Sequence, residues 1–182
     1  VHTEYYDDAK KLKKSETTYK DGKRDGLGTV WYTDGQKYYE RTYKDGKKDG
    51  LWTEWYEDGK KKKEITWKDG KYDGLYALWW DDGQKEYEGT YKDGKKDGLW
   101  TYWYENGQKI FKGTYLNGKE NGSWHWWYNN GKKRLQGSFS NGEKTGEWLF
   151  FSTNDEPMSY NQEFSTKIYS SDGRMLDKLF NE

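Results

Sequence analysis

The chain has 182 residues, of which 35% are charged and 20% aromatic, and its 32 basic and 32 acidic side chains leave no net charge. With a pI of about 6.9 it lacks the basic surplus of a nucleic-acid-binding protein, so nucleic acid is disfavoured as the main partner. The chain has no cysteine, which excludes disulfides and thiolate metal sites, and no apolar run approaches the roughly 20 residues that span a bilayer.

Residues 1–16 are expected to form an N-terminal arm or a degraded repeat, because Tyr5-Tyr6-Asp7-Asp8-Ala9 looks like a degraded turn. The chain begins at Val1 rather than Met, which suggests that a tag, an upstream segment or a signal peptide has been removed. We therefore slightly favour a secreted or cell-surface location over a cytoplasmic one.

Residues 17–155 contain six copies of a Thr/Ser–aromatic–x–Asp/Asn–Gly unit, with a constant period of 24 residues. A fixed period of this length is typical of a tandem repeat architecture. The repeated aromatic residues are Tyr19, Tyr43, Trp67, Tyr91, Tyr115 and Phe139. The chain is thus predicted to be an array of six repeats rather than a globular enzyme.

Each repeat is predicted to contain two strands and two glycine turns. The Asp-Gly and Asn-Gly pairs that end with Gly35, Gly59, Gly83, Gly107 and Gly131 suit two-residue type I′ hairpins, in which both central residues need positive φ. The other glycines are expected to be structural turn residues: Gly22, Gly26, Gly46, Gly50, Gly70, Gly74, Gly94, Gly98, Gly118 and Gly122. The fold class is all-β, as an elongated, twisted, single-layer antiparallel sheet of tandem hairpins.

A two-residue turn at Asn106-Gly107 predicts the register of the strands. It pairs Tyr104 with Lys109, Tyr102 with Phe111 and Trp100 with Gly113, and the same register pairs Trp124 with Gly137 and Tyr76 with Gly89. An aromatic ring over a cross-strand glycine fills the space that the glycine leaves. Elsewhere the register places Trp52 opposite Ile65, Arg41 opposite Gly28, and Glu54 opposite Lys63 as an opposite-charge pair.

The two sides of the predicted sheet differ. The first carries the column Trp52, Tyr76, Trp100, Trp124 and Trp148, which we expect to be largely self-covered. The second carries a tryptophan ladder in polar surroundings, flanked by leucines such as Leu51 and Leu99. Its tryptophans form the candidate interaction face: Trp31, Trp55, Trp79, Trp103 and Trp127.

Residues 156–182 are expected to form a C-terminal cap or tail, because terminal repeats must close an exposed end of the array. Met175, Leu176, Leu179 and Phe180 recur at spacings of three and four, which suits a short amphipathic helix or an irregular cap.

The string Gly-x-Trp-x-x-Trp/Tyr-Tyr-x-Asp/Asn-Gly, with Thr-Tyr-x-Asp/Asn-Gly-Lys-x-Asp-Gly, resembles the MORN repeat, for example in Gly98–Gly107 with Thr90–Gly98. It is closest to the bacterial variant in proteins known as antitoxins of the YwqK type. The resemblance implies a single-layer sheet of hairpins and a non-enzymatic role in protein or membrane association. It supplies no catalytic residues. Asp25-Gly26 and its equivalents replace the family's frequent His-Gly pair, which argues against importing phosphoinositide binding.

No catalytic, metal or cofactor site is expected. His2 is terminal, and His125 replaces a threonine of its column, so neither belongs to a cluster with ligand spacing. Paired carboxylates fall in turns, where Asp and Asn suit the backbone. The basic run Lys60–Lys63 is interpreted as a solvated strand edge.

Three functional hypotheses follow. The first, which we prefer, is a non-enzymatic scaffold that binds a partner protein or copies of itself end to end; a YwqK-type antitoxin with a toxin partner is one version. The second is a carbohydrate or cell-wall binding module that uses the tryptophan ladder. The third is membrane association through Lys-rich loops, which is weaker because each loop also contains Asp.

Overall fold

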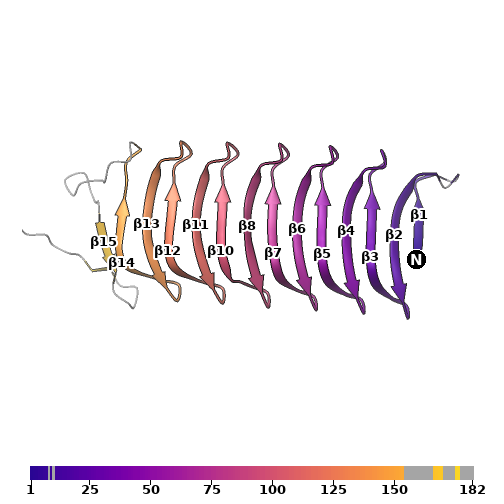
Figure 1. Ribbon diagram of the computed structural model, residues 1–182, viewed down its shortest axis with the longest axis horizontal. Coiled ribbons are helices and arrows are strands. Elements are labelled where there is room, and N and C mark those ends of the chain that lie inside the picture. Colours follow the sequence, from indigo (N-terminus) through magenta and orange to yellow (C-terminus); the bar gives the residue numbers. More distant parts are fainter. Residues whose placement is uncertain (8, 10, 154–165, 170–174, 177–182) are drawn as a thin grey trace, which may run out of the picture. The chain divides into compact units, whose positions relative to one another are not determined.

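The computed structural model describes residues 1–7, 9, 11–153, 166–169 and 175–176 (Figure 1). All regular secondary structure among these residues is β-strand. The chain divides into two compact units, Val1–Lys95 and Lys96–Glu182. Both units consist of antiparallel hairpins in a single layer, so the predicted all-β class is confirmed. The described residues include no helix with the length and hydropathy to cross a membrane.

The first unit is a run of consecutive antiparallel strands, each hydrogen-bonded to the next. The N-terminal residues take part, since the first strand pairs with the second. The strands are β1 (His2–Tyr5), β2 (Lys13–Lys20), β3 (Lys23–Trp31), β4 (Lys37–Lys44), β5 (Lys47–Trp55), β6 (Lys61–Lys68), β7 (Lys71–Trp79) and β8 (Lys85–Lys92). The short strand β9 (Lys95–Lys96) lies at the boundary of the two units.

The second unit repeats the arrangement with the strands β10 (Gly98–Trp103), β11 (Lys109–Leu116), β12 (Lys119–Trp127), β13 (Lys133–Ser140), β14 (Glu143–Phe150), β15 (Thr166–Tyr169) and β16 (Met175–Leu176). Consecutive strands again pair antiparallel. Of the two expected forms of the cap, the helix is therefore wrong at Met175 and Leu176, because both residues extend to pair with β15. Leu179 and Phe180 lie outside the described residues.

The two-residue turns occur at a different place from the one predicted. Asp21 and Gly22 both have positive φ, of 49° and 75°, and Lys20 faces Lys23 across them, which is type I′ geometry. The same turn recurs at Asp45-Gly46, Asp69-Gly70, Asp93-Gly94, Asn117-Gly118 and Asn141-Gly142, where both residues again have positive φ. The turn role of Gly22, Gly46, Gly70, Gly94 and Gly118 is confirmed.

The loops predicted to be type I′ contain three residues instead of two. The Gly107 N–H donates to the Tyr104 carbonyl at 2.9 Å, and the Tyr104 N–H donates to the Gln108 carbonyl at 2.8 Å. Gly107 has a φ of 78°, whereas the φ of Asn106 is not positive. This is the hairpin built from a type I turn and a glycine bulge. Trp103 consequently faces Lys109, and the predicted pairing of Tyr104 with Lys109 is wrong.

A bulge next to each of these loops restores the predicted register. Between Tyr102 and Trp103 the pairing shifts by one residue, which returns Tyr102 to Phe111 and Trp100 to Gly113. Every other pair predicted from the register is also confirmed: Trp124 with Gly137, Tyr76 with Gly89, Trp52 with Ile65, Gly28 with Arg41, and Glu54 with Lys63.

The second column of predicted turn glycines lies within or at the start of strands. Gly26, Gly50, Gly74 and Gly122 have positive φ and stand where the strand register shifts, while Gly98 opens β10. These positions are bulges, not turns. At Gly50, with φ of 82°, an added Cβ would also meet Thr42 Oγ1 at 2.6 Å, so a side chain fits neither the backbone nor the space.

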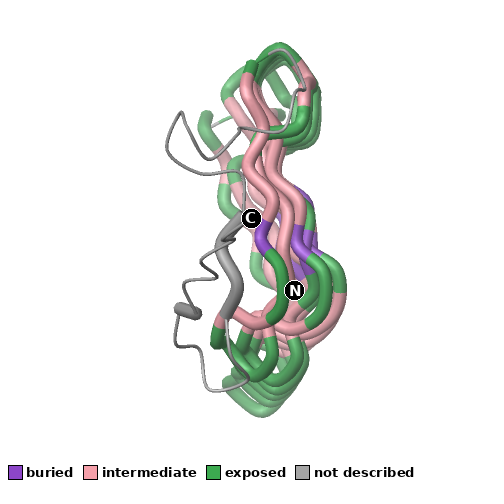
Figure 2. Tube along the Cα trace, turned by 90° about the vertical axis from the view of Figure 1, so that its left-hand side faces the viewer, coloured by how far each residue is buried: buried purple, intermediate pink, exposed green. Residues whose placement is uncertain are grey.

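The predicted aromatic side of the sheet contains most of the core. Trp100, Trp124 and Trp148 are 1–3% exposed, and Figure 2 shows the buried positions near the middle of the strands. Trp124, however, does not cover its cross-strand partner Gly137. A Cβ added at Gly113 would overlap the Trp124 ring, and one at Gly137 would overlap Trp148. Each ring thus covers a glycine of the preceding hairpin and joins two repeats.

Candidate functional site

Adjacent repeats are linked by a tyrosine clamp, in which a hydroxyl donates to a backbone carbonyl of the next repeat. Tyr32 Oη donates to the Trp55 carbonyl and Tyr56 Oη to the Trp79 carbonyl, both at 2.8 Å. Tyr104 and Tyr128 do the same in the second unit, and Tyr6 binds the Trp31 carbonyl at 2.7 Å. Tyr6 therefore takes the clamp role of the first hairpin, whose connection is longer than the later ones.

The two-residue turns are also bound to the preceding repeat. The Asp45 N–H donates to Asp25 Oδ2 at 3.1 Å, and the Gly46 N–H donates to the Arg24 carbonyl at 2.8 Å. The same pair of bonds recurs at the turns of Gly70, Gly94 and Gly118. Both ends of the hairpins are thus fastened by hydrogen bonds between repeats.

The candidate interaction face contains the predicted tryptophan ladder, whose members are half-buried. The Lys37 ammonium lies 5.8 Å from the centroid of the Trp55 ring, within cation–π range, and forms an ion pair with Glu40 at 2.6 Å. Trp31, Trp79 and Trp127 are capped by Lys13, Lys61 and Lys109 in the same way. We call this side the lysine-capped face, and the opposite side, with Trp52 and Trp124, the aromatic face.

Leucines beside the ladder are the exposed apolar part of the lysine-capped face. Leu27, Leu51 and Leu99 are 46–49% exposed, while Thr29, Thr53 and Thr101 between them and the tryptophans are buried. The face therefore combines exposed apolar side chains with regularly spaced Lys–Glu pairs held on the sheet.

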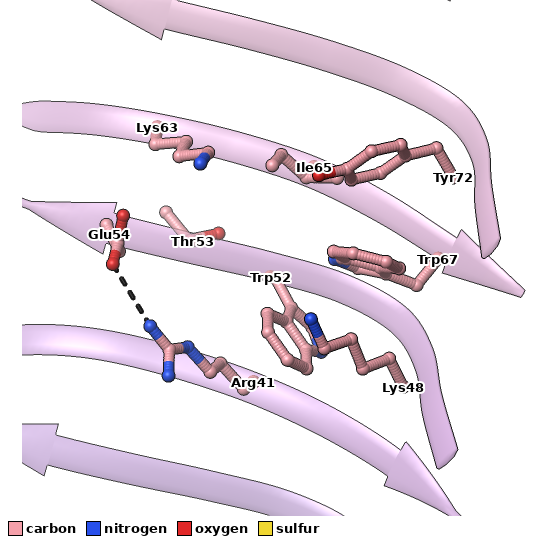
Figure 3. Close-up of a pocket in the computed structure, with 9 residues that line it drawn as sticks. All are labelled: Arg41, Lys48, Trp52, Thr53, Glu54, Lys63, Ile65, Trp67 and Tyr72. Carbon is pink, nitrogen blue, oxygen red and sulfur yellow. Dashed lines mark hydrogen bonds and ion pairs between the residues drawn. The ribbon is translucent and has the colours of Figure 1, made fainter. Parts of the chain in front are cut away.

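The aromatic face of the first unit contains a pocket that the sequence reasoning missed (Figure 3). It is a cavity of about 260 Å³ between β4, β5, β6 and the start of β7, with Trp52, Ile65 and Trp67 among its walls. Arg41 enters it, stacks 3.7 Å from the centroid of the Tyr39 ring, and pairs with Glu54 at 3.0 Å. Glu54 thus binds Arg41 rather than its predicted partner Lys63, although Glu54 and Lys63 are opposite in register.

Two lysines complete the pocket. The Lys48 ammonium lies 4.1 Å from the Trp67 ring and 4.7 Å from the Trp52 ring. Burial, and then the charges of Arg41 and Lys63, lower the pKa of Lys48 below its usual value. Lys63 is half-buried, so the interpretation of Lys60–Lys63 as a solvated edge holds for Lys60, Lys61 and Lys62 but is wrong for Lys63.

The histidines and carboxylates form no cluster in the described residues. No group of three or more His, Cys, Asp or Glu side chains there could hold a metal ion. His125 stacks on Trp127 at 5.9 Å, and burial, with Lys133 and Lys112 nearby, lowers its pKa. The turn aspartates bind backbone N–H groups, as Asp25 does with Asp45.

The fold of each unit defines a class of protein, the tandem β-hairpin repeat proteins, with a 24-residue repeat fastened by tyrosine clamps and turn hydrogen bonds. Four stretches match the family described as MORN repeat variant: residues 24–45, 48–69, 72–93 and 96–117. Each begins 24 residues after the last, and these stretches are MORN-variant repeats. No curated protein matches the chain.

Proposed function

We propose that this chain is a non-enzymatic scaffold that binds a partner protein through its lysine-capped face. MORN repeats are commonly modules of protein or membrane interaction, which supports this class of function. The proposal includes the absence of enzymatic activity, for which the support is the lack of any clustered nucleophile, base and acid among the described side chains.

The observation that carries the proposal is the exposure of Leu27, Leu51 and Leu99 beside a capped tryptophan ladder. About half of the surface of each leucine stays in water in the folded sheet. That half would gain about 25 cal/mol per Å² when a partner removes it from water. The Lys–Glu pairs around them would set the orientation of the partner more than its affinity. Since the sheet is fastened between repeats, little order has to be gained on binding.

The lysine caps favour a protein over a glycan as the ligand. A sugar ring stacks on an open indole face, and here the ammonium of Lys37 lies over Trp55 and that of Lys61 over Trp79. The scaffold has two special cases, which differ in the protein that it binds. A YwqK-type antitoxin would bind a toxin, and an end-to-end polymer would bind other copies of the chain.

Crosslinking tests the proposal within the first unit. In cells that express the chain, crosslinks from Lys37 and Lys61 should join it to one partner protein, and a Leu27→Ser/Leu51→Ser variant should lose them. Leu116→Ser is the matched control, because Leu116 is equally exposed at 52% but stands in another column. Retention of the partner by the double variant, or capture of no partner by a monomeric chain in light scattering, would contradict the proposal; crosslinks only between copies would establish self-assembly.

A further inference from the structure

The pocket of the aromatic face breaks the repeat pattern at three positions. Arg41, Glu54 and Lys63 are the charged members of columns that are otherwise uncharged. The equivalents of Arg41 are Thr17, Ile65, Gly89, Gly113 and Gly137; those of Glu54 are Val30, Leu78, Tyr102, Trp126 and Phe150; those of Lys63 are Ser15, Tyr39, Tyr87, Phe111 and Leu135. The repeat folds with uncharged residues at each position, so the fold does not require these charges.

Charged groups here are also unfavourable for stability by themselves. Removing an ion pair from water costs more than its attraction returns unless the geometry is very good, and apolar replacements are often neutral or stabilising. Three neighbouring repeats place aromatic and aliphatic side chains where Lys63 and Glu54 stand. A function for the pocket therefore explains the charges better than stability does.

The positive charge of the pocket is not balanced. Arg41, Lys48 and Lys63 bring three positive charges, and Glu54, the one acidic residue of the lining, is bound to Arg41. In the part of the chain that the structure describes, no carboxylate forms an ion pair with Lys48 or Lys63. Lys48 contacts two indole rings and Lys63 lies 5.9 Å from the Tyr76 ring. Figure 3 shows Lys48 extending along Trp52 and Lys63 extending towards Ile65 on the neighbouring strand.

The walls and size restrict the ligand. A cavity of about 260 Å³ lies just below the usual range for ligand pockets, roughly 300–1,000 Å³, so it suits one ring and a short chain rather than a nucleotide. Trp52, Trp67 and Ile65 offer an apolar and aromatic lining to the body of such a ligand.

The charged groups favour a carboxylate over a phosphate. Phosphate sites use backbone N–H nests, helix N-termini or free arginine forks. No glycine lines this pocket, and Nη2 of the Arg41 fork already donates to Glu54. Glu54 would also repel a dianion more strongly than a monoanion. Lys48 and Lys63, which form no ion pair with a carboxylate of the described residues, suit a ligand that carries one negative charge.

We propose that the pocket formed by Arg41, Lys48, Lys63, Trp52, Ile65 and Trp67 binds a single carboxylate carried on an aromatic or apolar body. Lys48 and Lys63 bind the carboxylate, Arg41 with Glu54 fixes one wall, and the indoles of Trp52 and Trp67 hold the body. The carboxylate is supplied either by a free organic acid or by an acidic residue or C-terminus of a polypeptide. The site is on the face opposite to the leucines, so it does not rest on the proposed scaffold function.

The test is a titration of the ¹⁵N-labelled full chain with 3-phenylpropionate, followed by NMR. Saturable shifts are expected at Thr53, Ile65 and the Trp67 indole, with a dissociation constant on the order of 1 mM, as befits a small ligand. The uncharged 3-phenylpropionamide should bind about 10-fold more weakly, since a charge-assisted bond is lost. A short peptide that ends in a C-terminal phenylalanine, compared with its amidated form, shows whether a polypeptide can supply the group.

Matched variants locate the binding. Lys48→Gln and Lys63→Gln should each weaken binding about 3- to 10-fold. Lys62→Gln changes the residue next to Lys63 but outside the lining, and Lys96→Gln removes one of the two lysines of the Lys48 column in the second unit. Both variants should leave binding unchanged. The unperturbed spectrum of each variant verifies its fold.

Three results would overturn the inference. They are the absence of saturable shifts at these residues up to about 20 mM acid, binding of inorganic phosphate as tight as that of the acid, and equal losses in Lys62→Gln and Lys63→Gln. Loss of carboxylate binding with retention of the crosslinked partner would reject this site while the scaffold function stands.

Discussion

The aromatic faces of the two units share the same strand arrangement, but different side chains cover the middle of the strands. In the first unit, Gly28 faces Arg41, and the charged Glu54 and Lys63 follow. In the second unit, the position of Arg41 is Gly113, which the Trp124 ring covers, and Tyr102 stacks on Phe111 at 4.4 Å. The second unit has a pocket of about 270 Å³ with Trp126, Leu135 and Phe150 in its lining, at positions equivalent to Glu54 and Lys63. In the first unit the pocket of about 260 Å³ is lined by charged side chains as well as rings.

This difference indicates that the repeat backbone folds with different sets of side chains on its aromatic face. Tyrosine clamps and turn hydrogen bonds are the same in both units, and they involve backbone groups at the loop ends. The middle of each strand is then free to vary between dense aromatic packing and a polar pocket. Four predictions test this separation.

The largest effect is expected from an added methyl group under a tryptophan. Gly113→Ala should displace the Trp124 ring and destabilise the chain by about 3 kcal/mol or more, because overpacking and lost ring burial add. Gly28→Ala in the first unit is the control. Its Cβ would lie 3.4 Å from Thr17 Oγ1, an ordinary contact, so it should change stability by less than about 1 kcal/mol. Urea unfolding measures both, and equal losses would refute the ring-over-glycine contact.

The tyrosine clamps should matter equally in both units. Tyr56→Phe and Tyr104→Phe each remove one hydroxyl donor and leave a half-buried carbonyl unpaired, which should cost about 1 kcal/mol in either unit. Slower-exchanging amides near Trp79 and Trp127 should lose protection in the respective variant. Tyr38→Phe is the control. The Tyr38 ring packs on Tyr32, and its hydroxyl forms no hydrogen bond with the described residues. A clear loss in only one unit would mean that the clamp is not a shared element.

Alkaline pH should weaken the first unit through its packed tyrosines. Burial first, and then Tyr76 nearby, raise the pKa of Tyr72 and Tyr91 above 10.0. A pKa that is raised in the folded state gives stability that is complete below the unfolded value and is lost as pH rises through the folded value. Lys48 acts in the opposite sense, since its lowered pKa makes the folded state release a proton first.

The Tyr72→Phe/Tyr91→Phe variant isolates the tyrosines from Lys48. Its urea midpoint should fall less than that of the unchanged chain between pH 9 and pH 11, a range that brackets about 10 for free tyrosine. Parallel curves for the two chains would show that the tyrosines do not couple to folding.

The smallest effect is expected at His125 in the second unit. Burial and two lysines lower its pKa below 6.5, so the unfolded chain takes up the proton first, and stability is lost as pH falls below about 6.5. His125→Thr, which restores the residue of Thr29, Thr53 and Thr101, should reduce the difference in thermal midpoint between pH 7 and pH 5. An unchanged difference in His125→Thr would refute the coupling.

Much of the fold could be predicted because the pattern repeats. The 24-residue period, the hairpin count and the partner of Trp52 follow from alternation and spacing, which act over a few residues. The loop type could not be predicted from Asn106-Gly107 alone, because such a pair also suits a three-residue loop whose glycine alone has positive φ. The register was nevertheless right for the other pairs, since the bulge between Tyr102 and Trp103 offsets the longer loop.

The site was harder to predict than the fold. Arg41, Glu54 and Lys63 are visible in the sequence as departures from their columns, yet Lys63 also belongs to a basic run with the signature of a solvated edge. Which neighbour Glu54 binds depends on side-chain reach across two strands, and Arg41 has the length and planar fork to reach it.

The repeat, the two kinds of face and most of the register follow from the sequence alone, because glycine spacing and strand alternation are local properties of the chain. Three outcomes appear only in the folded chain: the tryptophan rings lean onto the preceding hairpin, lysines cap four tryptophans of the ladder, and Lys48 and Lys63 line the same pocket. Those outcomes depend on contacts between neighbouring hairpins, where twist, bulges and side-chain length decide which atoms touch.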